Sequence, residues 1–343
     1  MAESPIDVLT GLDGMSRDRL RGACALIAGA GNIGSPLATF LAGCGLRRLI
    51  VLDRDRVEAK NLHTQDYRPE DVGRFKAEAL AERLRPRFPD VRIESITADL
   101  EDVPLGRFAV DLILGALDSR RSRQLLISEI AWPLGVPVVD GGVGEGWRGR
   151  VQTIVPAPDS ACLECTWGRE DYRQLTVEYP CIPDGAATAP ATVSPAFAGA
   201  AVASVMTAEA IRCIGGESER TSQEMAFDLF HRRWLLTRLR RSPACRFDHE
   251  VVRVDWTLGK PFAVARLGDL LATLRENIGD AERVHLECRR GVGARPGFAP
   301  SRLLSLDELR GRAAEPLAAL GLTPEDRPRL RWSGGSAFVV LKS

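Results

Sequence analysis

A glycine-rich stretch near the start of the chain is the segment best suited to bind a phosphate. Its glycines are Gly29, Gly31 and Gly34, in the pattern GxGxxG. Glycine lets the backbone turn tightly and approach a phosphate, and a helix that begins there offers amide donors and the positive end of its dipole. The pattern predicts a nucleotide site without saying which nucleotide.

The polar residues that follow favour a nucleoside triphosphate over a dinucleotide. Asp53 comes 24 residues after Gly29, where an acid accepts hydrogen bonds from ribose hydroxyls. Asn61, Gln65 and Lys76 come next. Attack at an α-phosphate builds up negative charge, which a fixed ammonium stabilises. The alternative for Lys76 is a solvated surface lysine, but the whole chain has only four lysines.

A second acid, Asp118, follows another predicted strand. A carboxylate at that edge of the sheet can hold Mg²⁺, which offsets phosphate charge. The alternative is a helix N-cap for the segment that begins near Ser119. Arg123 is close enough in sequence to orient Asp118 or a neighbouring loop.

Two pairs of metal-binding side chains lie far apart in the sequence. Cys162 and Cys165 form a CxxC, and Cys245 with His249 forms a second pair. Two such pairs can close a tetrahedral Cys₃His zinc site that joins their segments. His231 is the reserve fourth ligand.

A further cysteine, Cys181, lies between two prolines in a predicted loop. Near an acyl-adenylate it could accept the acyl group as a thioester, or it is an ordinary loop thiol. The chain has eight cysteines and no secretory signal at its start, so we expect thiols or metal ligands in the reducing cytoplasm rather than disulfides.

The elements that must position these residues alternate between strand and helix. Short apolar runs predict strands at residues 23–28, 48–53, 91–98, 110–117 and 136–139, and helical spacing predicts helices at 35–44, 73–84 and 119–132. This alternation predicts an α/β fold, a Rossmann-like doubly wound, mostly parallel sheet with its site at the carboxyl ends of the strands. Residues 151–155, 224–230 and 233–239 read as antiparallel edge strands.

We expect two domains. Residues 1–250 would form an ATP-binding adenylation domain that includes the zinc-binding segment. Residues 251–343 would form a small α+β domain with three strands and helices at 267–277 and 306–320, suited by position alone to docking a partner. The apolar run around 197–213 reads as a buried helix rather than a membrane span. The formal charge is zero, which argues against nucleic acid or an anionic membrane as partner.

Several pieces of the chain together resemble one family. They are GAGNIGS at 29–35, LDRDRV at 52–57, NLHTQ at 61–65, VGRFK at 72–76, ALDSRRSR at 116–123, WRGRVQTIVP at 147–156 and ACLEC at 161–165. Over about residues 18–250 the chain resembles the ThiF/MoeB/HesA-type family, relatives of the adenylation domain of ubiquitin-activating enzymes.

The resemblance implies an enzyme that binds Mg-ATP and adenylates the C-terminal glycine of a ubiquitin-like or sulfur-carrier protein. Some members then form a thioester, and a conjugating enzyme is a further expected partner, as is a second copy in a homodimer. Carried over by position, the nucleotide ligands would be Gly31, Asp53, Asn61 and Lys76, with magnesium on Asp118. Zinc would be held by Cys162, Cys165, Cys245 and His249, and Cys181 falls near the family's crossover-loop cysteine.

Three departures from the family pattern keep alternatives open. Thr64 stands where the family has an arginine that grips the triphosphate, which leaves a nucleotide-binding pseudoenzyme or scaffold as one alternative. No single residue among Arg17, Arg19 and Arg21 aligns with the family's N-terminal arginine. The second zinc pair is Cys/His instead of Cys/Cys. The glycines and Asp53 alone also fit an NAD(P)-dependent oxidoreductase.

Overall fold

The computed structural model describes residues 14–175, 194–216, 221–279, 283–288 and 302–342. It divides into two compact units. One consists of Met1–Leu100 and Val110–Val251, and the other of Glu101–Ala109 and Val252–Ser343. The second unit thus includes a short segment, Glu101–Ala109, that comes before strands β4 to β8 of the first unit in the sequence. The predicted division at residue 250 assigned this segment to the first domain.

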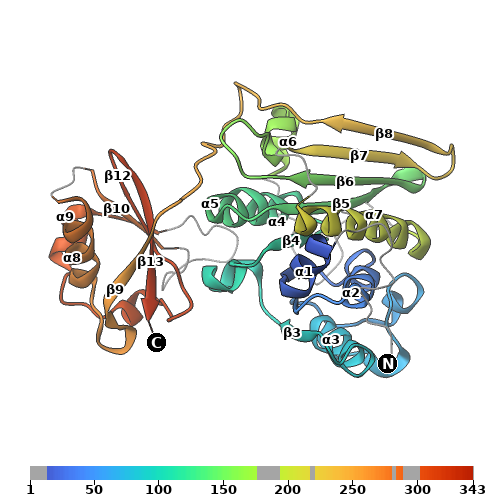
Figure 1. The fold of residues 1–343 in the computed structure, drawn as a ribbon, viewed down its shortest axis with the longest axis horizontal. Coiled ribbons are helices and arrows are strands. Elements are labelled where there is room, and N and C mark those ends of the chain that lie inside the picture. The colour runs from blue at the N-terminus through green and yellow to red at the C-terminus, as the bar shows by residue number, and fades with distance from the viewer. Residues whose placement is uncertain (1–13, 176–193, 217–220, 280–282, 289–301, 343) are drawn as a thin grey trace, which may run out of the picture. The chain divides into compact units, whose positions relative to one another are not determined.

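The first unit is built on an eight-stranded sheet in the order β3-β2-β1-β4-β5-β6-β7-β8. The strands are β1 Cys24–Ala28, β2 Arg48–Leu52, β3 Arg92–Ile96, β4 Leu112–Gly115, β5 Val138–Gly144, β6 Arg148–Ile154, β7 Gln223–Asp228 and β8 Arg233–Arg238. Pairing is parallel from β3 to β5 and antiparallel from β5 to β8, so β8 forms one edge (Figure 1). The predicted doubly wound fold with antiparallel edge strands is confirmed.

Helices cover both faces of this sheet because its central strands are apolar on both sides. All five residues of β1 and all four of β4 are buried. On one face lie α1 Gly14–Gly22, α2 Gly34–Gly43, α3 Lys76–Arg87 and α7 Ala196–Gly215. The opposite face carries α4 Arg120–Gln124, a π-helical turn over Leu125–Ala131, and α5 Trp132–Leu134.

Two predicted helices differ from the observed ones. The helix expected at 73–84 begins three residues later, because Gly73 is in a left-handed turn with φ +90° and Phe75 is still extended. Lys76 therefore opens α3. The helix expected at 119–132 keeps its place but widens into the π-helical turn.

Helix α7 is long and apolar enough to span a membrane by length and composition alone. In this structure its buried face rests on the sheet: the Met206 side chain lies where a Cβ on Gly141 of β5 would be. Buried positions along it include Ala198, Val202 and Ala210. The interpretation as a core helix therefore agrees with its packing.

The second unit has a five-stranded sheet in the order β11-β10-β12-β13-β9. Its elements are β9 Asp255–Pro261, α8 Leu267–Ile278, β10 His285–Cys288, β11 Arg302–Ser305, α9 Leu306–Gly311, β12 Arg329–Trp332 and β13 Gly335–Lys342. Only the β13–β9 pair is parallel. The α+β character is as expected, but the sequence predicted three strands rather than five.

The single helix predicted at 306–320 is wrong. Helix α9 ends at Gly311, and a separate 3₁₀ turn spans Leu317–Leu320. Between them the backbone forms a turn at residues 312–314 and a bend at Glu315 beside the start of α8, where the amides of Leu267 and Gly268 donate to the carbonyls of Glu315 and Ala313. Pro316, which cannot continue a helix, lies in this stretch.

The early segment of the second unit, residues 101–109, contacts Glu325 in the loop that precedes β12. The Gly106 amide donates to the Glu325 carbonyl at 2.9 Å. A Cβ on Gly106 would lie 2.3 Å from that same oxygen, so only glycine fits there. Phe108, two residues later, is fully buried.

Candidate active site and metal centre

The glycine turn connects β1 to α2 at the carboxyl edge of the sheet. Gly29 has φ +97°, a left-handed conformation that glycine adopts without strain. A Cβ on Gly34 would lie 1.8 Å from the Gly29 carbonyl oxygen, so this glycine allows α2 to begin against the turn. The backbone is therefore shaped as a phosphate-binding turn requires.

Asp53 follows β2 and is held against that turn. Its Oδ2 accepts the Ala30 amide at 2.6 Å, and its Oδ1 accepts the Asp55 amide at 2.7 Å. Burial raises the pKa of the Asp53 carboxyl, and the two amide hydrogen bonds oppose that rise. A carboxylate has further lone pairs, so ribose hydroxyls can still donate to it.

Lys76 is a buried lysine at the same edge. Its side chain is 9 % exposed, and Nζ lies 3.1 Å from Oδ2 of Asp55, whose side chain is 56 % exposed. The Lys76 amide also donates to the Asp55 carbonyl at 2.8 Å. A surface lysine is usually solvated, so this environment favours the functional interpretation over the solvated one. Asp55, two residues after Asp53, is thus the partner of Lys76.

Asn61, Thr64 and Gln65 come from one short element, the 3₁₀ helix Ala59–His63 and the residues after it. Asn61 is buried, its Oδ1 accepts the Glu58 amide at 2.8 Å, and its Nδ2 donates to no described residue. Gln65 lies beside Gly31, and its buried Oε1 has no hydrogen-bond partner among the described residues. An unsatisfied buried acceptor next to the glycine turn fits a missing ligand. Thr64, at the family's arginine position, is half-buried and neutral.

Asp118 lies three residues after β4, at the same carboxyl edge, and its side chain is exposed. The helix that follows is capped by Ser119, whose Oγ accepts the Ser122 amide at 3.0 Å. The alternative role of Asp118 as N-cap is therefore wrong. Its carboxylate accepts no hydrogen bond from the described residues, so it is available to a cation.

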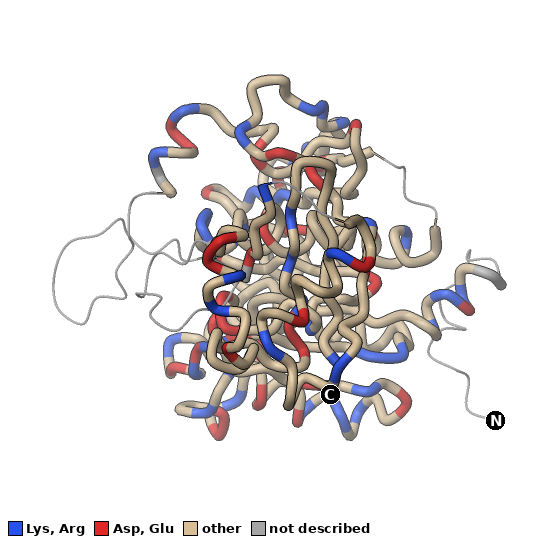
Figure 2. Tube along the Cα trace, turned by 90° about the vertical axis from the view of Figure 1, so that its left-hand side faces the viewer, with Lys and Arg blue, Asp and Glu red and all other residues tan. Residues whose placement is uncertain are grey.

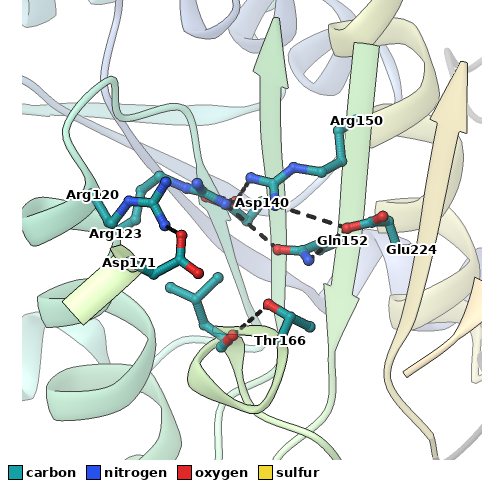
Figure 3. Close-up of polar contacts among 9 residues, drawn as sticks. Arg120, Arg123, Asp140, Arg150, Gln152, Thr166, Asp171 and Glu224 are labelled. Carbon is teal, nitrogen blue, oxygen red and sulfur yellow. Dashed lines mark hydrogen bonds and ion pairs between the residues drawn. The ribbon is translucent and has the colours of Figure 1, made fainter. Parts of the chain in front are cut away.

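Arg123, expected to orient Asp118 or a neighbouring loop, forms an ion pair with Asp140 instead. Its Nε donates to both oxygens of Asp140, at 3.2 and 2.9 Å, and its Nη2 donates to Oδ2 (Figure 3). Asp140 is fully buried on β5, in register with Gly115 of β4. A Cβ on Gly115 would lie 2.6 Å from Asp140 Oδ1, so glycine makes room for the carboxylate. The pair fixes α4, which begins two residues after Asp118.

A wider polar network extends from this pair across β6 to β7 (Figure 3). Gln152, in register with Asp140, donates to Oε2 of Glu224 at 2.7 Å. Arg150 lies 3.8 Å from both Asp140 and Glu224, and burial lowers the pKa of its guanidinium. Sequence reasoning missed Asp140, although Val138-Val139-Asp140 is a buried run ending in an acid, the same signal that identified Asp53.

The four predicted zinc ligands come together although their two pairs are far apart in sequence. Cys245 follows Cys162 by 83 residues, and His249 follows Cys165 by 84. Their ligand atoms all lie within 4.8 Å of one another. Cys162 Sγ is 3.8 Å from Cys165 Sγ and 3.6 Å from Cys245 Sγ, and Cys165 Sγ is 3.2 Å from His249 Nε2. Tetrahedral zinc with thiolates at about 2.3 Å places its sulfurs roughly 3.8 Å apart, so the cluster fits zinc.

The surroundings of the cluster also suit a metal. His249 Nδ1 lies 2.8 Å from the Phe247 carbonyl, which fixes the ring so that Nε2 faces Cys165. The ring of the fully buried Trp132 packs edge-on against His249 at 5.1 Å. The Cys162 hydrogen bond lowers the pKa of Cys165, and metal ligation requires the thiolate. His231, the reserve ligand, is paired instead with Asp228 at 2.9 Å.

Two other features bear on the site. Cys181 lies outside the described residues. Figure 2 shows basic and acidic residues interspersed along the chain, and the sequence has 46 of each. The electrostatic potential at the site therefore depends on nearby ion pairs such as Lys76–Asp55 rather than on a net charge of the protein.

This fold and site define a class: an α/β protein with a Rossmann-like sheet, a glycine turn and a buried lysine at the carboxyl edge of that sheet, and a Cys₃His cluster. The ThiF family model matches residues 7–247, and the chain belongs to the ThiF family. The predicted resemblance is thereby confirmed.

Curated relatives agree with this assignment. The chain is 30% identical over 237 residues to a sulfur carrier protein adenylyltransferase of Thermus thermophilus, covering 67% of this chain and 83% of that one. It is 29% identical to a SAMP-activating enzyme E1 of Haloferax volcanii, covering 61% and 73%. To ubiquitin-like modifier-activating enzyme 5 of Dictyostelium discoideum it is 32% identical, but it spans only 42% of that protein's length.

Solved structures show the same fold. Escherichia coli MccB with ATP superposes with a TM-score of 0.56 at 21% identity, covering 68% of each chain. MccB in complex with N-formylated MccA gives 0.55 at 20% identity. At this level of identity the likeness concerns the fold alone.

We expect the purified protein to contain about one zinc ion per chain, measured by mass spectrometry of the metal. Cys162→Ser should lose the zinc and lower the melting temperature, because the cluster joins segments far apart in the sequence. Cys213→Ser, on α7 and outside the cluster, is the control and should keep the zinc. A zinc-free wild type prepared without chelator would contradict the assignment.

Asp140→Asn should lower the free energy of unfolding by about 3–5 kcal/mol, because it leaves the mostly buried Arg123 guanidinium without its counter-charge. Urea unfolding measures the change. Asp171→Asn is the matched control: its pair with Arg120 is about one third exposed on both sides, and its loss should cost at most ~1 kcal/mol. Equal losses for the two variants would refute a special role for Asp140.

Proposed function

We propose that this protein uses ATP and magnesium to adenylate the C-terminal carboxylate of a ubiquitin-like or sulfur-carrier protein. The observation that carries the proposal is the buried Lys76 ammonium, presented with Asp53 and the glycine turn at one edge of the sheet. Family membership and the printed names of relatives, adenylyltransferases and activating enzymes, support the same reaction.

In the proposed step a carboxylate oxygen of the partner attacks the α-phosphorus of ATP. A new acyl–oxygen–phosphorus bond forms, the bond from the α-phosphorus to the bridging oxygen breaks, and pyrophosphate leaves with the electron pair. The groups that must act are therefore those that hold the triphosphate and stabilise the charge of the leaving oxygens.

Each residue has a distinct part in this proposal. The amides of the glycine turn and the α2 N-terminus bind phosphate, and Asp53 accepts from the ribose. Lys76 exchanges its pairing with Asp55 for a phosphate oxygen, and the Asn61 amide nitrogen supplies a further donor. Asp118 would hold magnesium, which offsets phosphate charge when bound.

The pseudoenzyme alternative is favoured by one observation, the neutral Thr64 at the family's arginine position. Losing one donor to the transition state typically costs a factor of about 10²–10³ in rate. If the unmodified chain is inactive and Thr64→Arg gains activity, the pseudoenzyme proposal holds. The oxidoreductase alternative gives no role to Lys76, Asn61 or the metal cluster.

Pyrophosphate exchange into ATP, dependent on a ubiquitin-like or sulfur-carrier protein, tests the proposal. Lys76→Ala should reduce exchange at least ~100-fold, because a fixed charge in a water-excluded site is lost. Lys60→Ala is the matched control, since Lys60 is 75 % exposed and pairs with Glu58. Exchange that survives in Lys76→Ala at the wild-type rate would rule out this role.

We also propose that the protein is a homodimer. The edge strand β8 exposes Trp234, Leu235 and Leu236 to 58–63 %, an unusual amount of apolar surface for an unpaired edge. Three further exposed aromatic residues lie together. The ring centroid of Trp147 is 5.1 Å from that of Phe197 and 5.4 Å from that of Phe230. Thioester formation on Cys181, a conjugating enzyme and docking by the second unit stay predictions.

Light scattering should give the wild type twice the mass of one 343-residue chain. Replacing both Leu235 and Leu236 by Lys should shift the protein to the monomer mass, because it puts charge on both faces of the edge strand proposed as the interface. A wild type that runs as a single chain at micromolar concentration would disprove the dimer.

A further inference from the structure

Arg150 on β6 differs from the other charged residues of the network in how it is held. Asp140 already receives hydrogen bonds from Arg123, and Glu224 receives one from Gln152. Arg150 is only within ion-pair range of each acid, at 3.8 Å, and donates a hydrogen bond to no described residue. Two carboxylates therefore fix the guanidinium by charge while its N–H donors stay unused.

The position of Arg150 places these donors at the rim where the proposed reaction would occur. Arg150 pairs with Gly142, two residues beyond Asp140 on β5, towards the carboxyl edge of that strand. Its side chain is on the same face as Gln152 and Arg123, because residues two apart on a strand share a face. It is 32 % exposed, so a ligand can reach it.

The spacing of the strands sets which part of a ligand Arg150 can contact. β6 is two strands from β4, the strand that leads to Asp118. Neighbouring strands lie about 4.8 Å apart, so this separation is roughly 10 Å, the length of about three extended residues. An extended tail with its terminal carboxylate near Asp118 and Lys76 that runs across the strands toward β6 would place a residue just upstream of its end beside Arg150.

We propose that Arg150 binds an oxygen acceptor, carboxylate or carbonyl, in the last few residues of the acyl partner's C-terminal tail. This inference rests on the proposed adenylation function and adds a residue that selects the partner rather than the nucleotide. A guanidinium suits the role because its planar fork donates two parallel hydrogen bonds to oxygen acceptors. Its partial burial strengthens such bonds, because water competes less.

The test measures pyrophosphate exchange with a sulfur-carrier protein ending in Gly-Gly that the wild type accepts. Arg150→Gln should raise the KM for the carrier at least ~10-fold and leave the KM for ATP within about twofold, because the two lost hydrogen bonds are to the tail alone. Arg148→Gln is the matched control: it is on the same strand and face, but 68 % exposed and paired with Asp228. It should change neither constant.

An unchanged carrier KM in Arg150→Gln, or an equal rise in both constants, overturns the inference. If that variant is unstable by thermal unfolding, Arg150→Lys keeps the charge but loses the fork and should still raise the carrier KM. Replacing acidic residues near the carrier's end by their amides distinguishes the two acceptors: the Arg150→Gln effect disappears if the acceptor is a side chain and persists if it is a carbonyl.

The proposed function can fail separately. If no carrier supports exchange with the wild type, adenylation is rejected. Calorimetry without ATP, on a Gly-Gly carrier that the wild type binds, still decides the role of Arg150: equal affinity for wild type and Arg150→Gln rejects it, and a loss of at least ~10-fold in the variant supports it.

Discussion

The close approach of the glycine turn to its neighbouring strands is the constraint on which this site depends. Gly29 adopts a left-handed conformation, and a Cβ there would lie 2.4 Å from the Ala116 carbonyl at the end of β4. Gly34 then fits against Gly29 without a side chain. The Ala30 amide, held between them, donates to Asp53 after β2. Three neighbouring strands thereby converge at one edge, where amides, a carboxylate and a buried ammonium are presented together.

Much of this arrangement could be predicted from sequence because it obeys local rules. Apolar runs ending in glycine or an acid marked the parallel strands, and the order of strands and helices defined the doubly wound fold. The zinc cluster was predictable because metal ligands are few and chemically distinct: CxxC and CxxxH are both visible in the sequence. Lys76 was noticeable for its rarity.

The remainder could not be read from local pattern because it depends on tertiary pairing. Nothing near Arg123 of helix α4 indicates that its partner is Asp140, 17 residues away on strand β5. Ser119 and Asp118 are both good helix caps, and only the backbone geometry decides between them. In the second unit, a turn and a bend at residues 312–315, bonded to the start of α8, interrupt a helix that periodicity favoured. Such contacts override weak local preference because packing contributes more free energy than propensity does.

The placement of residues 101–109 means that the chain passes between the two units three times, after residues 100, 109 and 251. A single cut in the chain therefore cannot separate the two units. A version of the protein ending near residue 250 would keep the buried Leu105 and Phe108 but remove the rest of the unit to which they belong, including Glu325, whose carbonyl accepts the Gly106 amide. Shortened forms would therefore expose the apolar 3₁₀ turn Leu105–Phe108, and their solubility would reflect that surface as well as the folding of the first unit.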